Sequence, residues 1–180
     1  MVDAGHNPPS SADAALVVIS GLPATGKSTI ARALAQHHKI PYVRIDTIEQ
    51  SLIRSGIADV SGTAGYITGY ALAAEQLRLG LSVVVECVNP VEATRNAWSA
   101  TALHNSARLL SVEVICSDPD EHRRRAERRV VDIPDLVLPT WQEILDRDYE
   151  PWTTERLVLD TAIMNSESAV RRITARIFTE

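Results

Sequence analysis

Eight consecutive residues at positions 21–28, Gly-Leu-Pro-Ala-Thr-Gly-Lys-Ser, match the phosphate-binding pattern G-x-x-x-x-G-K-[ST] at every fixed position. The glycines allow the backbone to turn its N–H groups inward around an anion. Lys27 would reach the β- and γ-phosphates of a nucleotide, and the Ser28 hydroxyl would bind Mg²⁺. An apolar run precedes the pattern and a helix-forming stretch follows it, which is the strand–loop–helix setting that the motif requires. We therefore predict an ATP and Mg²⁺ site, rather than an ordinary glycine-rich turn, at Gly21, Leu22, Pro23, Ala24, Thr25, Gly26, Lys27, Ser28 and Thr29.

The composition fits one domain with a hydrophobic core, since 45% of the 180 residues are hydrophobic. A net charge of −5 argues against a protein that coats nucleic acid, because such proteins carry a basic surface. The sequence shows no secretory segment and no apolar run near the roughly 18 residues of a membrane span. We expect a cytoplasmic protein with no membrane contact, a disordered tail over 1–13 and a single domain over 14–180. The oligomeric state stays open.

Short β-branched runs alternate with helical patterns along the whole chain. The expected strands are 16–20, 42–46, 82–87, 110–116 and 156–160. The expected helices are 27–38, 47–55, 64–79, 90–104, 119–130, 140–148 and 166–178. Two helices have an Asx residue followed by proline at their start, Asn89-Pro90 and Asp118-Pro119, and a third begins with the capping-box pattern of Thr140. This alternation predicts an α/β domain, with a parallel sheet covered by helices on both faces.

Polar residues at the carboxyl ends of these strands are the candidates for chemistry, because ligands of such sheets bind there. They are Asp46, Glu86, Cys116 and Asp160. Asp46 would lie beside the phosphate loop and could accept the proton of a hydroxyl that attacks the γ-phosphate. The alternative is a helix capping box formed by Asp46 and Glu49, a common use of D-x-x-E. We favour the catalytic base.

Glu86 closes an otherwise apolar strand, and a carboxylate in that position needs a partner. One candidate partner is Mg²⁺, bound through one of its waters, so that Ser28 and Glu86 would form the metal site. The other is a structural hydrogen bond to the region of Ser28. The sequence leaves both open.

Five arginines lie within residues 123–129. Such a charge run is commonly a solvated helix, and we accept that interpretation for Arg123 and Arg124. Arg125 and Arg129 are four residues apart and would share one helix face. The stretch 130–139 follows them with two prolines, two aspartates and no clear periodicity, and it resembles a lid. We expect Arg125 and Arg129 to stabilise charge on a transferring phosphoryl group, beneath a lid at about 130–140.

From Leu16 to about Phe178 the chain resembles the P-loop kinases of small molecules and nucleic-acid ends, a family of predicted kinases often described as AAA-type ATPases. This family is similar to the adenylylsulfate, gluconate and chloramphenicol kinases and to the kinase domain of phage polynucleotide kinase. The resemblance implies a five-stranded parallel sheet in the order 2-3-1-4-5 with a lid after the fourth strand. It also implies a shared acid and shared lid arginines, here Asp46, Arg125 and Arg129.

The stretch from Asn89 through Arg95 to Trp98 resembles the polynucleotide kinase segment that helps to form the acceptor site. We therefore name Arg95, with Tyr66 and Tyr70, as candidate acceptor contacts beside Asp46. For the tyrosines the alternative is a helix face that is simply part of the core.

One departure from the family bears on the acceptor. Polynucleotide and adenylylsulfate kinases carry D-x-x-R after the second strand, where the arginine holds an acceptor phosphate. Glu49 stands at that place here, and a carboxylate would repel a phosphorylated acceptor. The pattern is closer to the antibiotic kinases. A true AAA motor would need a second helical domain, for which this chain has no room.

These observations predict an ATP- and Mg²⁺-dependent phosphotransferase acting on a hydroxyl of a small, uncharged or cationic molecule, with nucleic acid disfavoured as a partner. The first alternative is a 5′-hydroxyl polynucleotide kinase, which would need a basic groove and stacking aromatics. The second is a nucleotide-binding switch that hydrolyses ATP slowly. Asp46 argues against a switch, because a switch has no acceptor to deprotonate.

Cysteine and histidine offer no metal-ligand spacing in this sequence. In the implied strand order, Cys87 and Cys116 would be separated by a further strand, at about twice the spacing of roughly 4.8 Å between neighbours. That exceeds the Cα separation of about 7 Å that a disulfide tolerates. We expect two free thiols, and five histidines at the surface.

Overall fold

A computed structural model describes residues 14–56 and 63–178, so the expected tail over 1–13 lies outside the described residues. The strands are β1 (Ala15–Ser20), β2 (Tyr42–Arg44), β3 (Val83–Glu86), β4 (Arg108–Ile115) and β5 (Leu157–Asp160). The helices are α1 (Lys27–His38), α2 (Ile45–Arg54), α3 (Ala64–Arg78), α4 (Glu92–His104), α5 (Pro119–Arg128), α6 (Trp141–Leu145) and α7 (Ser166–Ile177).

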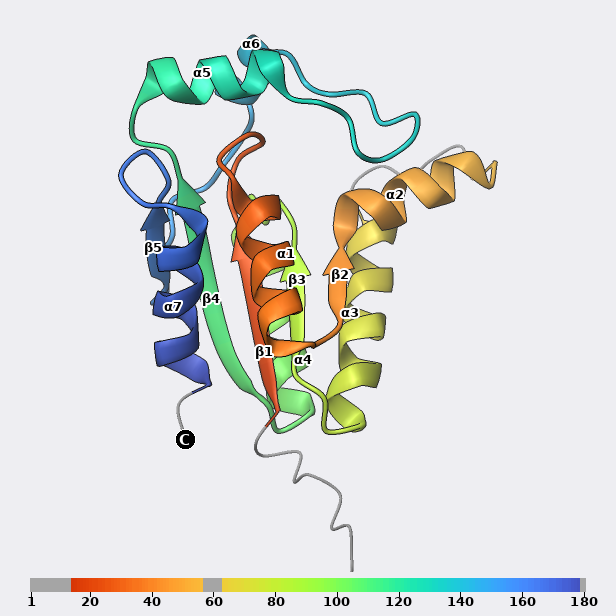
Figure 1. The fold of residues 1–180 in the computed structure, drawn as a ribbon. Coiled ribbons are helices and arrows are strands. Elements are labelled where there is room, and N and C mark those ends of the chain that lie inside the picture. The colour runs from red at the N-terminus through yellow and green to blue at the C-terminus, as the bar shows by residue number, and fades with distance from the viewer. Residues whose placement is uncertain (1–13, 57–62, 179–180) are drawn as a thin grey trace, which may run out of the picture.

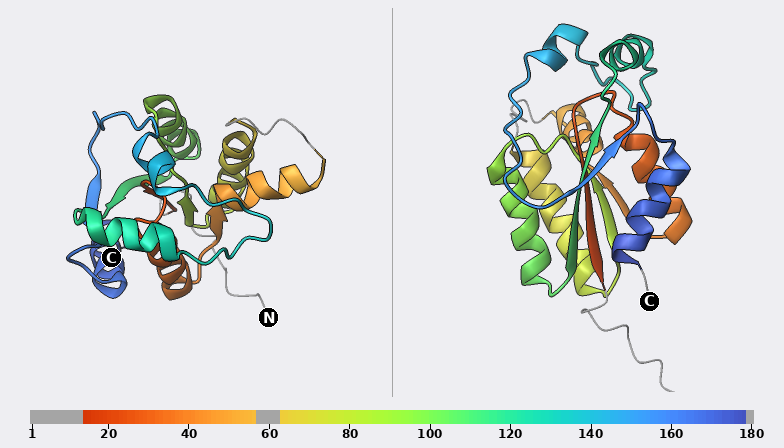
Figure 2. Two further views of the ribbon diagram at one scale, coloured as in Figure 1. Left: turned by 90° about the horizontal axis from the view of Figure 1, so that it is seen from above. Right: turned by 90° about the vertical axis from the view of Figure 1, so that its left-hand side faces the viewer.

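The described strands form one five-stranded sheet in the order β2-β3-β1-β4-β5, and every neighbouring pair is parallel. This confirms the order expected from the sequence. Helices α1 and α7 cover one face and α3 and α4 the other, while α5 and α6 lie beyond the carboxyl ends of the strands (Figures 1 and 2). The phosphate loop opens at that same edge, so the fold brings α5 over it.

The central strand β1 supplies both hydrophobic cores, because neighbouring residues of a strand point to opposite faces. Val17 and Ile19 join the core beneath α1 and α7, and Leu16 and Val18 join the core beneath α3 and α4. All six β1 residues are buried, which is why this strand reads as an uninterrupted apolar run. The phosphate loop therefore follows a strand that is buried along its whole length.

Two of the expected helix starts are confirmed. The Asp118 side chain accepts hydrogen bonds from two backbone N–H groups at the start of α5. Thr140 and Glu143 form the full capping box of α6. The third is wrong, since α4 begins at Glu92 after Val91, and Asn89 is a buried residue with φ +55°. Its amide donates instead to the Ser20 hydroxyl, at 3.0 Å.

The second strand is shorter than expected, and this moves Asp46 out of the sheet. β2 ends at Arg44, and α2 starts at Ile45. Ile45 is 1% exposed and lies so close to Gly69 of α3 that a Cβ there would be 2.3 Å from its Cδ1. Burial of Ile45 against α3 turns the chain into the helix, so Asp46 occupies the first turn of α2.

Both cysteines are free thiols, as expected from the strand order; Cys87 is buried and Cys116 is partly exposed. Within residues 14–56 and 63–178, no helix combines the length and the apolar character needed to cross a membrane.

Candidate functional site

Two glycines set the shape of the loop over 21–26. Gly21 has φ +145°, and a Cβ there would lie 2.3 Å from the Val114 carbonyl oxygen, so β4 leaves no room for a side chain. Gly26 has φ +95° and ends the loop at the first turn of α1. Glycine adopts such backbone angles without the steric cost that other residues meet. The loop geometry therefore follows from the residue types in the motif.

Lys27 is the first residue of α1 and is 4% exposed. Its Nζ donates a hydrogen bond to the Leu22 carbonyl, at 3.2 Å, so the ammonium folds back over the loop. Burial lowers the pKa of Lys27, and the nearby carboxylates of Glu86 and Asp46 oppose that effect. An anionic ligand at the loop would add to these carboxylates and favour the charged ammonium.

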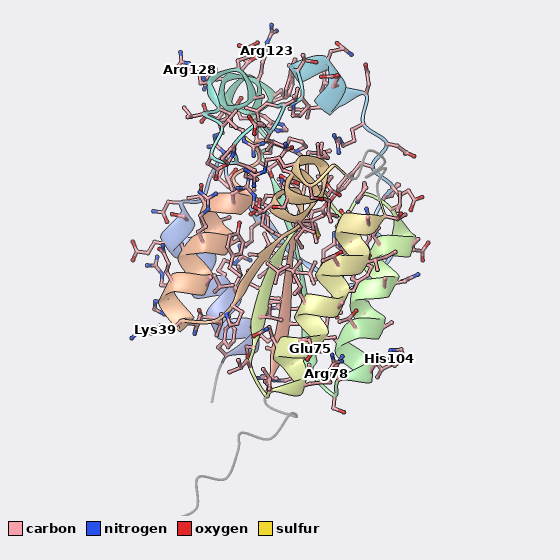
Figure 3. The ribbon with its side chains drawn as sticks, turned by 90° about the vertical axis from the view of Figure 1, so that its right-hand side faces the viewer. Lys39, Glu75, Arg78, His104, Arg123 and Arg128 are labelled. Atoms are coloured by element: carbon pink, nitrogen blue, oxygen red, sulfur yellow. The ribbon has the colours of Figure 1, made fainter. Side chains whose placement is uncertain are left out.

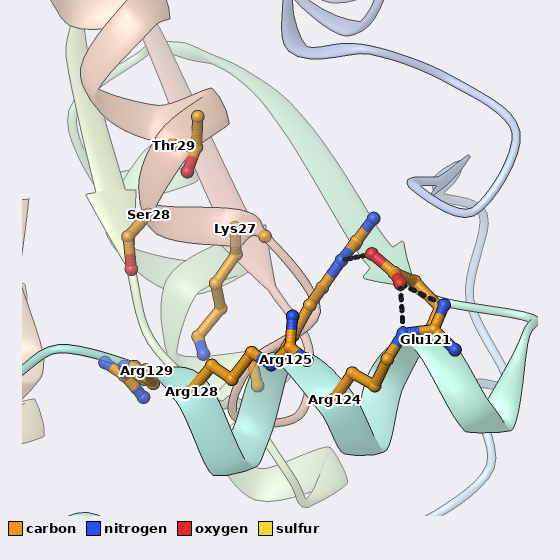
Figure 4. Close-up of a pocket in the computed structure, with 10 residues that line it drawn as sticks. Lys27, Ser28, Thr29, Glu121, Arg124, Arg125, Arg128 and Arg129 are labelled. Carbon is orange, nitrogen blue, oxygen red and sulfur yellow. Dashed lines mark hydrogen bonds and ion pairs between the residues drawn. The ribbon is translucent and has the colours of Figure 1, made fainter.

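A cavity of about 350 Å³, here called the loop cavity, lies between this loop and α5. Figure 4 shows Lys27 on the loop side of this cavity and Arg124, Arg125 and Arg128 on the α5 side, with Glu121 bonded to two of these arginines. Its lining residues include Gly26, Lys27, Ser28, Arg125 and Arg129. The volume lies in the range of small-ligand pockets.

Arg125 and Arg129 both line the loop cavity, but they do not share a helix face as expected. α5 ends at Arg128, and Arg129 has an extended backbone, with φ −60° and ψ 127°. Arg125 is held by Glu121, at 2.7 Å, and by the hydroxyl and carbonyl of Thr161. Arg129 forms no hydrogen bond or ion pair with the described residues, so its guanidinium is available to a ligand.

Arg123 and Arg124 pair with glutamates of their own helix, in agreement with the solvated helix expected for them. Their side chains are 60% and 52% exposed. In Figure 3 the Arg123 side chain extends away from the body of the molecule.

Glu86 accepts two hydrogen bonds at the end of β3, one from the Ser28 hydroxyl and one from the Tyr42 hydroxyl. The sequence leaves two partners open for Glu86, Mg²⁺ and a structural hydrogen bond to the region of Ser28. The hydrogen bond is present. Burial, followed by Glu86, raises the pKa of Tyr42, so this phenol stays protonated as a donor. The Glu86 carboxylate and the Ser28 hydroxyl thus place two oxygen atoms that could bind a metal ion beside the phosphate loop.

Arg44 is a residue that the sequence analysis did not single out, and it has three acidic neighbours. Its side chain is 5% exposed; its Nε lies 3.6 Å from Glu86, its Nη2 3.9 Å from Asp46 and its Nη1 2.9 Å from Asp132. Nε and Nη2 have no hydrogen-bond partner among the described residues. Arg44 thus holds a charge between two candidate site carboxylates and the segment after α5.

Asp132 belongs to residues 130–140, here called the lid segment, which runs from above α1 towards α2 (Figure 1). It accepts hydrogen bonds from Arg44 and from Arg32 of α1. The lid segment is thereby joined to α1 and to the end of β2.

A second cavity, of about 620 Å³ and here called the lid cavity, lies between α2, the segment before α4 and the lid segment. Asp46 and Glu49 line it from α2, and Tyr66 lines it from α3. Lys27 and Arg129 line both cavities. A ligand in the lid cavity would therefore approach the same two cations as a ligand in the loop cavity.

The capping-box alternative for Asp46 is wrong. The residue at the cap of α2 is Arg44, and no side chain of the described residues caps this helix. Asp46 is one of the residues that line the lid cavity, and its side chain is 26% exposed. Its role as a base stays a prediction.

Arg95, expected to contact the acceptor, is a buried structural anchor. Its guanidinium donates to four backbone carbonyls, those of Asn89, Pro90, Glu150 and Pro151, at 2.7–3.2 Å. Its Cζ also lies 4.2 Å from the centre of a Trp152 ring. These contacts occupy the guanidinium, and Arg95 does not line the lid cavity. The expectation that Arg95 contacts the acceptor directly is therefore wrong.

The two tyrosines named as candidate acceptor contacts, Tyr66 and Tyr70, lie in different surroundings. Tyr70 packs edge-on against Trp98, with ring centres 4.3 Å apart, and belongs to the core rather than to the lid cavity. Tyr66 lines the lid cavity, and its hydroxyl accepts a hydrogen bond from the Asn89 backbone N–H, at 2.8 Å. A contact between Tyr66 and the acceptor stays a prediction.

His122 contradicts the expectation that the histidines are at the surface. It is 8% exposed on α5, its Nε2 lies 2.8 Å from the Pro23 carbonyl oxygen, and its ring packs edge-on against Trp141. This side chain ties α5 and α6 to the phosphate loop. Its place inside an arginine-rich stretch of sequence gave no signal of burial.

A parallel sheet in the order 2-3-1-4-5 with a phosphate loop after the first strand defines the class of P-loop NTPases with a kinase fold. The family model described as an AAA domain matches residues 16–151, and the chain belongs to that family. No curated protein sequence gives a significant match.

Several solved structures share the fold. An APS kinase from Mycobacterium tuberculosis, solved with AMPPNP and APS, has a TM-score of 0.69 and 16% identity, and the match covers 96% of this chain and 100% of that one. A gluconokinase from Sinorhizobium meliloti 1021 has a TM-score of 0.61 and 19% identity, covering 95% and 92%. Shikimate kinase from Bacteroides thetaiotaomicron has a TM-score of 0.61 and 14% identity, covering 92% and 99%.

Proposed function

We propose that this protein is a phosphotransferase that moves the γ-phosphate of ATP to a hydroxyl group of a small molecule. The observation that carries the proposal is the pair of cavities that share Lys27 and Arg129. One is built on the phosphate loop, and the other contains the carboxylate of Asp46. A nucleotide and an acceptor bound in these cavities would present their reacting groups to the same cations. The kinases among the structures of the same fold support this class of reaction.

In the proposed reaction the acceptor hydroxyl attacks the γ-phosphorus in line and transfers its proton to Asp46. The bond between the γ-phosphorus and the β–γ bridging oxygen breaks, and ADP leaves with the electron pair. Lys27 and Arg129 stabilise the negative charge at the transferring phosphoryl group. Arg125 lines the loop cavity, where Thr161 and Glu121 fix the orientation of its guanidinium.

Mg²⁺ would be held by the Ser28 hydroxyl, with Glu86 acting through a bound water. The donor set fits this ion, since both groups supply oxygen and already contact each other beside the loop. The described residues contain no group of three or more His, Cys, Asp or Glu side chains that could hold a metal, which agrees with an ion held largely by phosphates and water. When bound, Mg²⁺ neutralises charge on the phosphate oxygens.

The experiment is ATP turnover measured against a panel of hydroxylated metabolites, antibiotics and 5′-hydroxyl oligonucleotides, with each product identified by mass spectrometry. We expect ADP formation to depend on a small-molecule acceptor and on Mg²⁺. Transfer to the oligonucleotides alone would replace the proposal with a polynucleotide kinase. Slow hydrolysis that no acceptor stimulates would indicate a nucleotide switch.

A further inference from the structure

The lid cavity has walls of two kinds. Its apolar wall is formed by Ile45, Val91 and the lid residues Leu136, Val137 and Leu138. Its polar side carries Asp46 and Glu49, three residues apart on α2. Side chains with this spacing lie on one face of a helix, with Cβ atoms about 5–6 Å apart. A ligand in the cavity would therefore meet two carboxylates from one direction.

Glu49 has no partner for its charge in the described part of the chain, where it forms neither a hydrogen bond nor an ion pair. The backbone of α3 lies directly against its stem, since a Cβ on Gly65 would be 2.3 Å from Glu49 Cγ and 2.8 Å from its Oε1. Any side chain at position 65 would collide with Glu49. Gly65 therefore lets a half-buried carboxylate stand at the cavity wall.

The other charges at this cavity do not neutralise Glu49. Lys27 and Arg129 also line the loop cavity, where the phosphates would bind. Arg147 is exposed and lies outside ion-pair distance of Glu49. Burial first, and then Asp46, raises the pKa of Glu49 to about 7, while Arg147 lowers it. A neutral ligand that displaced water here would raise the desolvation free energy of the charged Glu49 carboxylate. A cationic ligand would offset that free energy by pairing with the carboxylate.

We propose that the acceptor carries an alkyl ammonium group and that Glu49 binds this group while Asp46 faces the hydroxyl. The inference rests on the proposed phosphotransfer and adds the substrate class, an amino alcohol. Because the two carboxylates rise from one face of α2, with Cβ atoms roughly 5–6 Å apart, the ammonium and the reacting hydroxyl should lie on the same side of the acceptor. The apolar lid wall would cover the carbon skeleton.

The experiment uses acceptors in matched pairs that differ by one amine, such as 1-amino-1-deoxyglucitol with glucitol, glucosamine with glucose, and aminocyclitols with the corresponding cyclitols. We expect the amine of at least one pair to be the better substrate in kcat/KM. Glu49→Gln should lower kcat/KM for the amine by about 10- to 100-fold, the range for a lost hydrogen bond to a charged group. For the neutral compound the same variant should leave kcat/KM unchanged or raise it, because no charged carboxylate then loses its water to the ligand.

Glu75→Gln is the matched control, because Glu75 is 63% exposed and pairs only with Arg78 among the described residues. Both residues lie near the carboxyl end of α3, at the opposite end of the molecule from α5 (Figure 3). A wild-type enzyme that prefers the neutral members, or Glu49→Gln with unchanged preference for the amine, would overturn the ammonium inference and leave phosphotransfer standing. If neither set stimulates ATP turnover while a 5′-hydroxyl oligonucleotide does, or if no compound does, both proposals fail.

The pH dependence gives an independent measurement. KM for an amine that stays protonated between pH 6 and 8, such as 1-amino-1-deoxyglucitol rather than glucosamine, should fall as the pH rises through that range because Glu49 ionises. The groups that face Glu49 are Asp46, Tyr66, Lys27, Arg129 and Arg147, and all of them remain in Glu49→Gln. KM in that variant should therefore be flat over this range. An equal pH dependence in both enzymes would contradict the role of Glu49.

Discussion

The loop cavity and the lid cavity share Lys27 and Arg129 but take the rest of their walls from different kinds of structure. The loop cavity combines one continuous segment, whose shape is set by backbone angles at Gly21 and Gly26, with charged side chains of α5 on the opposite side. The lid cavity collects side chains from α2, α3, the segment before α4 and the lid segment. In the proposed reaction, a phosphate would therefore meet main-chain groups of the loop together with cationic side chains, and an acceptor would meet mainly side chains.

This difference separates the phosphate-binding part of the site, which suits any nucleotide, from the part that would distinguish one acceptor from another. Backbone N–H groups bind any phosphate, so the loop can remain the same while the acceptor changes. Exposed side chains at the lid cavity, such as Val137 in the lid segment, lie outside both hydrophobic cores and can be exchanged without disturbing the sheet below.

Lys27→Ala should reduce phosphoryl transfer by about 10³–10⁵-fold, the range seen when a cation at the transferring phosphoryl group is lost. It should also weaken ATP binding, because it removes a buried ammonium from the loop. Transfer rates and nucleotide titration measure the two effects. Lys39→Asn is the control, since Lys39 is exposed and its left-handed backbone suits asparagine. Full activity of Lys27→Ala would refute the nucleotide site.

Asp46→Asn should lower transfer by about 10²–10⁴-fold, the range for loss of a general base, while ATP affinity is retained. Asparagine keeps the shape of the side chain, and Asp46 caps no helix among the described residues, so the melting temperature should change little. Parallel assays of transfer, ATP binding and thermal unfolding separate the outcomes. If transfer survives, the base must be sought among the other carboxylates, Glu49 or Glu86.

Asp132→Asn should raise KM by up to about fivefold with little change in kcat, because a partly exposed ion pair contributes roughly 1 kcal/mol or less. Asp132 is 36% exposed and joins the lid segment to Arg44 and Arg32. Steady-state kinetics measure the change. Asp135→Asn removes the same charge from the same segment at an exposed position with φ +65°, which asparagine tolerates. Equal effects of both changes would mean that the contact with Arg44 is not what matters.

Glu49→Gln should raise the melting temperature by a few degrees at pH 8 and leave it close to that of the wild type at pH 4. Burial raises the pKa of Glu49 to about 7 from 4.5, so between these values the native state holds a proton that the unfolded chain has released. The free energy of unfolding therefore falls as the pH rises through this window. Thermal unfolding at several pH values measures the divergence, with Glu75→Gln as control. A constant difference across pH would contradict the perturbed carboxyl group.

The sequence predicted the parts of the molecule that depend on local residue types. The loop and the starts of α5 and α6 each rest on residues next to one another in the chain, such as Asp118 with Pro119, whereas the strand order was implied by the resemblance to P-loop kinases. It could not predict contacts made by folding. Arg95 reaches carbonyls some 55 residues away, and His122 reaches Pro23 across 99 positions. No local pattern marks such partners, so the Arg95 and histidine expectations were wrong and the contacts of Arg44 were missed.

The position of Asp46 shows the same limit on a smaller scale. The run Tyr42–Arg44 continues into Ile45 without any turn residue, so a strand ending at Asp46 was the natural expectation. What ends the strand is the packing of Ile45 against Gly69, which belongs to another helix. The residue was identified correctly as a member of the site region, while its secondary structure required the tertiary contact.

The Arg95 anchor also bears on which positions can change during evolution. All four of its hydrogen-bond acceptors are main-chain carbonyls, of Asn89, Pro90, Glu150 and Pro151. Every residue type carries a carbonyl, so substitutions at positions 150 and 151 keep the acceptors for Arg95, while a change of Glu150 removes only the hydrogen bond that its side chain accepts from the Glu92 backbone N–H. Substitution of Arg95 removes every donor at once. Selection on this junction should therefore act most strongly on Arg95. Positions 150 and 151 should vary more freely among relatives that phosphorylate different substrates.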